Sequence, residues 1–205
     1  MPSAAPTTLV IARHGETEAN LAGVHQGRTD SPLTSDGHEQ ASALAAELSG
    51  RYPEAVAIYT SPLGRAQATA AAIAQTLGLS ISVEPALVEG SFGEWEGATL
   101  EEMVTRGFWD RAKANPDYAA PGGESFRACG ARAAAVFQQI AARHIGATVI
   151  AVTHQGPICQ GIANLVDSGY PGFQYGLRNG GFREIEFGSA GIRLGAVWRA
   201  RSVDL

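Results

Sequence analysis

Short apolar runs alternate with amphipathic stretches along most of this 205-residue chain. The four clearest runs are typical of buried strands and lie at residues 8–12, 56–59, 81–84 and 148–153. Strands that alternate with helical patterns indicate an α/β fold with a largely parallel sheet. The pattern changes after Leu177, where two further strands are predicted at residues 182–187 and 192–198. Glycines flank the short segment between them, which is typical of a hairpin, so at least one late strand is expected to run antiparallel.

Helices are predicted where apolar residues recur at helical spacing behind a capping signal. Asp36 with Glu39 forms one candidate capping box, and Thr99 with Glu102 forms another. A third amphipathic helix is predicted from residue 125 to about residue 143. No internal repeat or low-complexity linker interrupts this order, so we expect residues 1–205 to form a single domain.

One predicted helix breaks local rules in its first turn. It starts at Ser61-Pro62, runs to Leu77 and carries Gly64 and Arg65 near its beginning. A glycine costs about 1 kcal/mol relative to alanine in a helix, and a cation near a helix N-terminus is unfavourable by roughly 0.3 to 1 kcal/mol. An anion bound at this end would make both features attractive. The alternative is that Arg65 simply points into solvent.

Composition and charge limit the partners of such a site. The chain is 45% hydrophobic, 17% charged and carries a net charge of -5, which is ordinary for a soluble globular protein. A negative balance without basic blocks argues against nucleic-acid or anionic-membrane binding. The first eight residues lack the features of a signal peptide, and no apolar run approaches the ~20 residues that span a bilayer, so a cytoplasmic location is expected. Cys129 and Cys159 have no metal-binding spacing and are expected to be buried apolar side chains.

Charged and imidazole side chains follow three of the predicted strands. Arg13 and His14 follow the first, Arg65 comes shortly after the second, and His154 follows the run that ends at Thr153. Because the carboxyl ends of parallel strands form the ligand crevice of an open sheet, these residues can converge. His154 taken alone is as typical of a buried structural histidine as of a functional one.

Two arginines and a helix N-terminus suit a dianionic group such as phosphate. A neutral imidazole is a competent nucleophile, so a phosphohistidine intermediate is predicted. Departure of an alkoxide then needs a carboxylic acid close by, with its pKa raised by burial. Glu89, Glu94 and Glu96 are the candidates, and spacing alone does not choose between them.

The residues resemble, block by block and in order, the histidine phosphatase superfamily, also called phosphoglycerate mutase-like. The blocks are Arg13-His14-Gly15-Glu16-Thr17 with Asn20, Gln26-Gly27-Arg28, Asp30 and Pro32-Leu33-Thr34, then Ser61 to Ala66 with Thr69, then Leu87 to Gly97, and finally Val152-Thr153-His154. The resemblance implies a three-layer α/β/α sandwich on a mixed, mostly parallel six-stranded sheet with one antiparallel strand. It also implies that the protein needs no metal and no cofactor.

Carried over position by position, the resemblance implies that His14 is the phosphorylated nucleophile and Glu89 the proton donor. It implies a phosphate pocket completed by Arg13, Arg65 and His154, with further phosphate or substrate contacts from Asn20, Gln26, Gly27 and Gln155. Many members of the family have glycine where this chain has Gln155. The longer side chain predicts either a narrower pocket or a contact with the substrate.

Three functions are compatible with these residues. The favoured one is a phosphomonoesterase that hydrolyses a small phosphorylated metabolite, resembling the branch that contains alpha-ribazole phosphatase and broad small-molecule phosphatases. The second is phosphoglycerate mutase-type phosphotransfer, which is disfavoured because Arg106, Arg111 and Lys113 are scattered and form no arginine pair. The third, a non-catalytic protein that binds a phosphorylated ligand, fits poorly because every catalytic position holds a competent residue.

The leaving-group side of the site is less defined. Four aromatic residues between positions 92 and 126 are candidates to line it, namely Phe92, Trp109, Tyr118 and Phe126, although core packing is expected for Phe126. The aromatic stretch 169–175 is expected to be an exposed contact or a rim of the site. The oligomeric state is left open, with a homodimer as one candidate.

Overall fold

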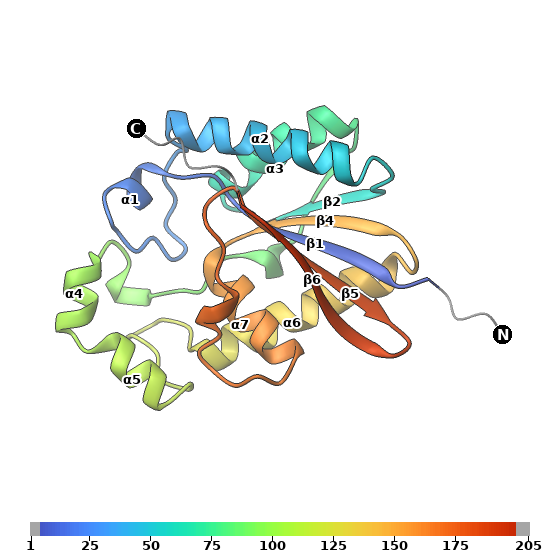
Figure 1. Cartoon of the computed structure of the whole chain (residues 1–205). Coiled ribbons are helices and arrows are strands. Elements are labelled where there is room, and N and C mark those ends of the chain that lie inside the picture. The colour runs from blue at the N-terminus through green and yellow to red at the C-terminus, as the bar shows by residue number, and fades with distance from the viewer. Residues whose placement is uncertain (1–4, 200–205) are drawn as a thin grey trace.

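A six-stranded sheet forms the centre of the computed structural model, which describes residues 5–199 (Figure 1). The strands lie in the order β3-β2-β4-β1-β5-β6. Their bounds are β1 Thr7–Arg13, β2 Ala57–Thr60, β3 Ile81–Val83, β4 Thr148–Thr153, β5 Phe182–Gly188 and β6 Gly191–Trp198. β1 to β4 are parallel, whereas β5 is antiparallel to both β1 and β6. The mixed sheet with one antiparallel strand is therefore confirmed.

Helices cover both faces of the sheet. α2 (Ser35–Arg51) and α3 (Gly64–Leu77) lie on one face, and α6 (Phe126–Arg143) and α7 (Gln155–Leu165) lie on the other (Figure 1). Alternate residues of β1 serve the two layers, because Val10 packs in the cluster with α2 and α3 while Leu9 packs in the cluster with α6. Both side chains are fully buried. This is the three-layer α/β/α sandwich that was predicted, and it explains why β1 is a continuous apolar run.

Short elements, namely three helices at the left of Figure 1 and three single turns, connect the strands and the larger helices. They are α1 (Glu18–Leu21), α4 (Leu100–Thr105), α5 (Phe108–Ala114) and three single turns of 3-10 helix at Pro85–Leu87, Gly93–Trp95 and Phe173–Tyr175. α4 and α5 belong to a third apolar cluster, centred on Met103 and Phe108. This cluster is separate from the two that cover the sheet.

The capping predictions have mixed outcomes. The Thr99/Glu102 box is confirmed at the start of α4, and Ser125 caps α6. The Asp36 prediction is wrong, because the side chain of Thr34 caps α2 by accepting a hydrogen bond from the backbone N–H of Gly37 at 2.9 Å. Threonine at this position precedes the first helical residue, where a cap has to lie.

The start of α3 also differs from the prediction. The helix begins at Gly64 rather than at Ser61-Pro62, and Leu63 at its N-cap offers no side-chain hydrogen bond. The carboxylate of Asp30, from a loop far away in the sequence, accepts hydrogen bonds from the backbone N–H groups of Gly64 and Arg65. A cap supplied over such a distance leaves no local signal in the sequence.

Both cysteines are buried and unpaired, as expected. Within residues 5–199, no helix has the length and apolar character needed to cross a membrane.

Candidate active site

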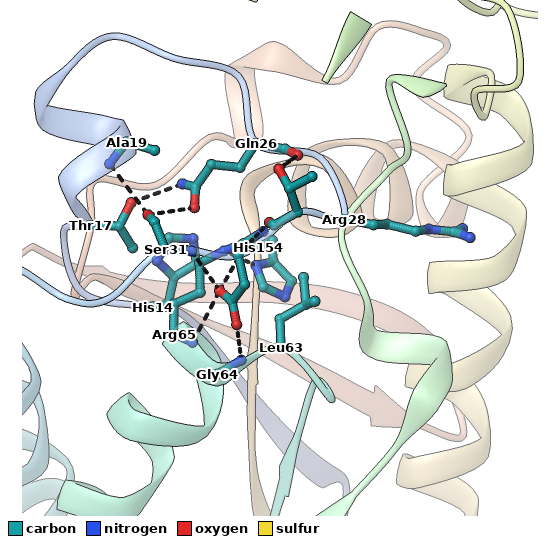
Figure 2. A network of polar contacts seen from close by, with 12 residues as sticks. His14, Thr17, Ala19, Gln26, Arg28, Ser31, Leu63, Gly64, Arg65 and His154 are labelled. Carbon is teal, nitrogen blue, oxygen red and sulfur yellow. Dashed lines mark hydrogen bonds and ion pairs between the residues drawn. The ribbon is translucent and has the colours of Figure 1, made fainter. Parts of the chain in front are cut away.

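The three strand ends that carry Arg13 with His14, Arg65 and His154 meet at one edge of the sheet. They border a cavity of about 360 Å³, a size suited to a small molecule. Arg13, His14, Arg65 and Glu89 line one end of this cavity, and we call these four residues the phosphate floor. Figure 2 shows the polar contacts around His14, Arg65 and His154.

His14 is buried, with a side chain fixed in one tautomer. Its Nδ1 lies 2.7 Å from the carbonyl oxygen of Gly15. Because a carbonyl only accepts, Nδ1 carries the proton and Nε2 keeps its lone pair. Burial, together with the positive charges of Arg13 and Arg65, holds the pKa of His14 well below its usual range. The imidazole is therefore neutral at physiological pH and nucleophilic at Nε2.

Close backbone packing holds the segment around His14 in place. The backbone N–H of Gly15 donates to Thr69 Oγ1 at 3.0 Å, and the amide of Asn179 donates to the carbonyl of His14 at 3.1 Å. A Cβ atom at Gly15 would lie 2.3 Å from the carbonyl oxygen of Gly37. Only glycine permits the start of α2 to approach the nucleophile segment so closely.

Arg65 is almost completely buried and held by several acceptors. Its Nη1 donates to Asp30 Oδ1 at 3.0 Å and to the carbonyl of Thr29 at 2.7 Å, and its Nη2 donates to the carbonyl of Gly27 at 2.8 Å. Its Nε donates to His154 Nδ1 at 3.2 Å. Four of the five guanidinium N–H groups are thus used to fix the side chain. Arg65 reaches the cavity with its orientation already set.

The anion at the start of α3 is part of the protein. Sequence reasoning predicted that a bound anion makes Gly64 and Arg65 favourable at this helix end, and the carboxylate of Asp30 takes that place. Asp30 belongs to the sequence blocks that resemble the histidine phosphatase superfamily, but the sequence did not predict it as a site residue. An oxygen that caps the helix and pairs with the arginine satisfies both groups at once.

His154 lies behind Arg65 and does not line the cavity. Its Nδ1 accepts from Arg65, so its Nε2 carries the proton and donates to Ser61 Oγ at 2.7 Å. The rings of His14 and His154 are 5.1 Å apart between centroids. Burial, and then the proximity of His14 and the two arginines, lowers the pKa of His154 well below its usual range. In this arrangement His154 orients Arg65, and direct contact of His154 with phosphate stays a prediction.

Glu89 is the one of the three candidate glutamates that lines the cavity. Its Oε1 accepts hydrogen bonds from the backbone N–H groups of Gly90 at 2.8 Å and Gly156 at 3.0 Å. Burial of the carboxyl group raises its pKa, against smaller opposing effects of these hydrogen bonds and of Arg65 and Arg13. A Cβ atom at Gly156 would lie 2.4 Å from Glu89 Oε1, so glycine is needed for this approach.

Glu96 does not line the cavity, and its hydrogen bonds hold two loops together. Its carboxylate accepts hydrogen bonds from the backbone N–H groups of Arg28 and Thr29, both at 3.0 Å, and from Ser91 Oγ. Gly27 approaches this carboxylate with a φ of 56°, and a Cβ atom there would lie 2.4 Å from Glu96 Oε1. Gly27 thereby serves the site through its carbonyl group, which accepts from Arg65.

Asn20 and Gln26 both line the cavity, as predicted for phosphate-binding residues. The Nε2 group of Gln26 donates to Thr17 Oγ1 at 2.8 Å, and its Oε1 accepts from Ser31 Oγ at 3.0 Å (Figure 2). The Oδ1 atom of Asn20 accepts from the backbone N–H of Thr17. Hydrogen bonds from either amide to a phosphoryl group stay predictions.

Gln155 and Arg13 both form hydrogen bonds with the backbone of Leu177. The backbone N–H of Leu177 donates to Gln155 Oε1 at 3.1 Å, and Arg13 Nη1 donates to the carbonyl of Leu177 at 2.8 Å. Gln155 also lines the cavity, as does Phe173. Its longer side chain therefore anchors the segment that holds Arg13, a role that sequence reasoning did not predict.

The cavity is also lined by aromatic rings, and the imidazole of His25 packs against two of them. We call Phe92, Trp109, Phe126 and Phe173 the aromatic wall. Phe126 packs against Phe108 in the third apolar cluster, as expected, and it also lines the cavity. Tyr118 does not line the cavity but contacts the far side of Phe108. Phe173 makes the predicted stretch 169–175 a rim of the site.

The scattered cations of residues 98–124 lie away from this cavity. The guanidinium of Arg106 stacks on Trp95, and that of Arg111 stacks on Tyr118. Neither these arginines nor Lys113 line the cavity. Among residues 5–199, no group of three or more histidine, cysteine, aspartate or glutamate side chains is placed to hold a metal ion.

Several supporting residues escaped sequence reasoning. Ser61, Asn179 and Arg132 each bind an atom that sets the geometry of the floor, and Arg132 Nη1 holds the carbonyl groups of Ala86 and Val88 at 2.8 Å just before Glu89. Asn179 lies just before β5, and the local sequence pattern assigns it no role. Arg132 lies on an amphipathic helix, where an arginine is ordinarily a solvated residue, so its sequence position carried no signal.

Comparisons with known proteins agree with this geometry. The sequence pattern of the "Histidine phosphatase superfamily (branch 1)" matches residues 9–198. A metal-independent phosphoserine phosphatase of Arabidopsis thaliana is 40% identical over 158 residues, which cover 73% of this chain and 65% of that protein. A bifunctional protein of Mycobacterium tuberculosis is 36% identical over 166 residues, which cover 80% of this chain and 45% of that protein. The matched region is thus less than half the length of this mycobacterial relative.

A solved structure of the predicted branch is also similar. The putative alpha-ribazole-5'-P phosphatase of Escherichia coli superposes with a TM-score of 0.79 at 27% identity, covering 97% of this chain and 98% of that one.

Proposed function

The chain belongs to the histidine phosphatase superfamily, and we propose that it is a metal-independent phosphomonoesterase that hydrolyses a small phosphorylated metabolite through a phosphohistidine at His14. The proposal rests on the chemical groups that line the cavity. A neutral imidazole with a free Nε2 and a carboxyl group of raised pKa line the same cavity as Arg13 and Arg65. Nucleophile, acid and anion-binding groups are the parts that this reaction needs.

In the first half-reaction, Arg13 and Arg65 bind the phosphoryl oxygens, and His14 Nε2 attacks phosphorus. The bond from phosphorus to the ester oxygen breaks as the N–P bond forms. The departing alkoxide takes the proton of Glu89 and leaves as a neutral alcohol. Asp30 and His154 keep Arg65 in place while negative charge shifts on the phosphoryl group.

In the second half-reaction, the ionised Glu89 accepts a proton from water, and the oxygen of that water attacks the phosphohistidine. The N–P bond breaks, His14 returns to its neutral form and inorganic phosphate leaves. Glu89 then carries the proton that came from water.

Hydrolysis is favoured over transfer within a phosphoglycerate. The relatives include enzymes named phosphoserine phosphatase, and the cations that a second acidic group of the substrate would need do not line the cavity.

A cytoplasmic location and a small phosphorylated substrate are part of the proposal. Cell fractionation tests the location, and sedimentation velocity tests the homodimer.

The decisive experiment follows release of phosphate from 4-nitrophenyl phosphate in the presence of EDTA. We expect turnover in the wild type and a loss of at least about 10³-fold in His14→Ala. His38→Ala is the matched control, because His38 is exposed and does not line the cavity. In Glu89→Gln we expect one burst of nitrophenolate followed by slow turnover, because this leaving group needs no acid but the second step needs the base.

Two outcomes would overturn the proposal. Full activity of His14→Ala would exclude this residue as nucleophile. Isomerisation of 3-phosphoglycerate without release of inorganic phosphate, followed by phosphorus NMR, would establish a mutase.

A further inference from the structure

Rings from three separate segments meet at the aromatic wall. Trp109 of α5 and Phe126 of α6 are stacked, with centroids 6.4 Å apart and planes inclined by 29°. Phe173 lies nearly perpendicular to both, at 5.9 Å from Trp109 and 5.7 Å from Phe126. Because these rings come from different segments, the fold itself brings them together, and they form an apolar surface before any ligand binds.

Two apolar side chains at the cavity remain largely uncovered. Phe173 is 43% exposed and Leu100 is 56% exposed, and both line the cavity. Apolar surface next to a polar site is typical of a place where a ligand is bound, because the ligand removes that surface from water.

Charge at this end of the cavity disfavours a second anionic group. The arginines that line the cavity, Arg13 and Arg65, both belong to the phosphate floor. Glu124 also lines the cavity, next to Ser91, and its carboxylate is held by Arg132 at 2.7 and 2.9 Å. A carboxylate on the leaving group would face this glutamate and would find no cation of its own.

The same glutamate does not favour a cation. Its charge is already matched by Arg132 and by Arg28, whose Nη2 lies 3.5 Å from Glu124 Oε2. The side chain of Arg28 points away from His14 and Arg65, towards the helix that carries Arg132 (Figure 2). Paired charges and uncovered rings leave a surface suited to a neutral group.

We propose that the aromatic wall binds an uncharged ring or other apolar group of the leaving alcohol, and that it selects such phosphomonoesters over those that carry a carboxylate or an ammonium group. This inference rests on the proposed phosphatase function and specifies its substrate class. It separates this chain from the enzymes named phosphoserine phosphatase among its relatives, since serine carries both charged groups.

Four phosphate esters of primary alcohols test the proposal: 2-phenylethyl phosphate, ethyl phosphate, O-phosphoserine and phosphocholine. All four release an alcohol of the same type, so differences in kcat/KM report on contacts beyond the phosphate. Burial of one ring predicts that 2-phenylethyl phosphate exceeds ethyl phosphate on the order of 10-fold to 100-fold. Phosphoserine and phosphocholine are expected to fall below ethyl phosphate. An equal or higher kcat/KM for either charged ester than for 2-phenylethyl phosphate would overturn the inference.

A matched pair of variants on α4 localises the effect. Leu100→Ala is expected to reduce the ratio of kcat/KM between 2-phenylethyl and ethyl phosphate about 3-fold to 10-fold. Val104 is 59% exposed on the same helix and does not line the cavity, so Val104→Ala is expected to leave the ratio unchanged. Equal ratios in both variants would mean that the apolar lining of the cavity does not select the ring, which would overturn the inference.

Failure of the inference is distinguishable from failure of the phosphatase proposal. If the wild type releases phosphate neither from these four esters nor from 4-nitrophenyl phosphate, the phosphatase proposal fails. The wall is then tested by calorimetric titration of the His14→Ala variant, where tighter binding of 2-phenylethyl phosphate than of ethyl phosphate supports it and equal binding overturns it.

Discussion

The two ends of the cavity are built in different ways. The phosphate floor is held by hydrogen bonds that lead directly into the sheet, as in the 3.1 Å bond from the backbone N–H of His14 to the carbonyl of Thr153. The aromatic wall is held by ring contacts, and Phe108 behind it lies 5.0 to 6.0 Å from five neighbouring rings. Directional bonds fix positions closely, whereas apolar packing tolerates exchange of side chains.

The phosphate floor and the aromatic wall therefore have different roles. The floor sets the reaction, because each of its groups has a single orientation. Three rings of the wall, Phe92, Trp109 and Phe126, pack against an apolar cluster separate from those that cover the sheet, so the shape of the wall can differ between proteins without disturbing the floor. We therefore expect floor variants to affect all phosphate esters alike and wall variants to change the preference among them.

The largest effect is expected for Asp30→Asn. This change removes the carboxylate from buried Arg65 and weakens the cap of α3. We expect the free energy of unfolding in urea to fall by about 2 kcal/mol, below the full value for a buried pair because Asp30 is 37% exposed. Values of kcat/KM should fall on the order of 10²-fold for ethyl and 2-phenylethyl phosphate alike.

The matched control is Asp117→Asn, which breaks the ion pair with Arg127. Both partners there are more than half exposed, so a loss below about 1 kcal/mol is expected. Equal losses in the two variants would mean that Asp30 is an ordinary surface residue.

A smaller but purely catalytic effect is expected for Gly156→Ala. The added methyl group would displace the Glu89 carboxylate, which lies 2.4 Å from its position. A shift of the proton donor by about 1 Å should lower kcat on the order of 10²-fold with little change in the melting temperature. Gly50→Ala is the control, since a Cβ atom there meets no neighbour and alanine favours the helix. Unchanged kcat in Gly156→Ala would contradict the role of Glu89.

The substitution Phe108→Leu tests the aromatic wall through a residue that packs against its rings. Phe108 is buried and touches Phe92, Trp109 and Phe126, so a smaller side chain should loosen all three rings. We expect a loss of about 1 to 1.5 kcal/mol in unfolding free energy. The preference for 2-phenylethyl over ethyl phosphate should fall several-fold. A proportional loss with both esters would show that wall and floor are not independent.

The smallest effect is a pH dependence of stability. The depressed pKa of buried His154 means that the unfolded chain takes up a proton below its usual pKa of about 6.5 while the folded protein does not. The stability that His154 contributes is present above pH 6.5 and falls as the pH is lowered. The difference in unfolding free energy between wild type and His154→Gln should shrink by about 0.8 kcal/mol between pH 8 and pH 6. A constant difference, measured by urea unfolding, would mean that His154 takes up its proton equally in the folded and the unfolded protein.

The sheet was predictable because its central strands are buried on both faces. Residues 8–12 and 148–153 are continuous apolar runs, and the structure places them side by side in β1 and β4. Convergence of Arg13, His14 and Arg65 followed from the rule that parallel strands end at one edge. The start of α3 was not predictable, since its cap comes from Asp30, which is distant in the sequence.

Side-chain direction was the other limit. The sequence pattern of α6 indicates that Phe126 is apolar but not that it faces a cavity, since packing and lining need the same kind of residue. Gln155 was recognised as unusual, yet its partner Leu177 is contacted only in the folded chain. Contacts between distant segments depend on tertiary packing, which no local pattern encodes.

Glu89 has a consequence for the energetics of binding. Arg65 and Arg13 partly offset the effect of burial on its carboxyl group. A dianionic ligand between the arginines cancels their positive field, so the pKa of Glu89 rises and the carboxyl group takes up a proton as the ligand arrives. Binding heats of a phosphate ester to His14→Ala should therefore differ between two buffers of unlike ionisation enthalpy. The ester itself draws in the proton with which its alcohol departs.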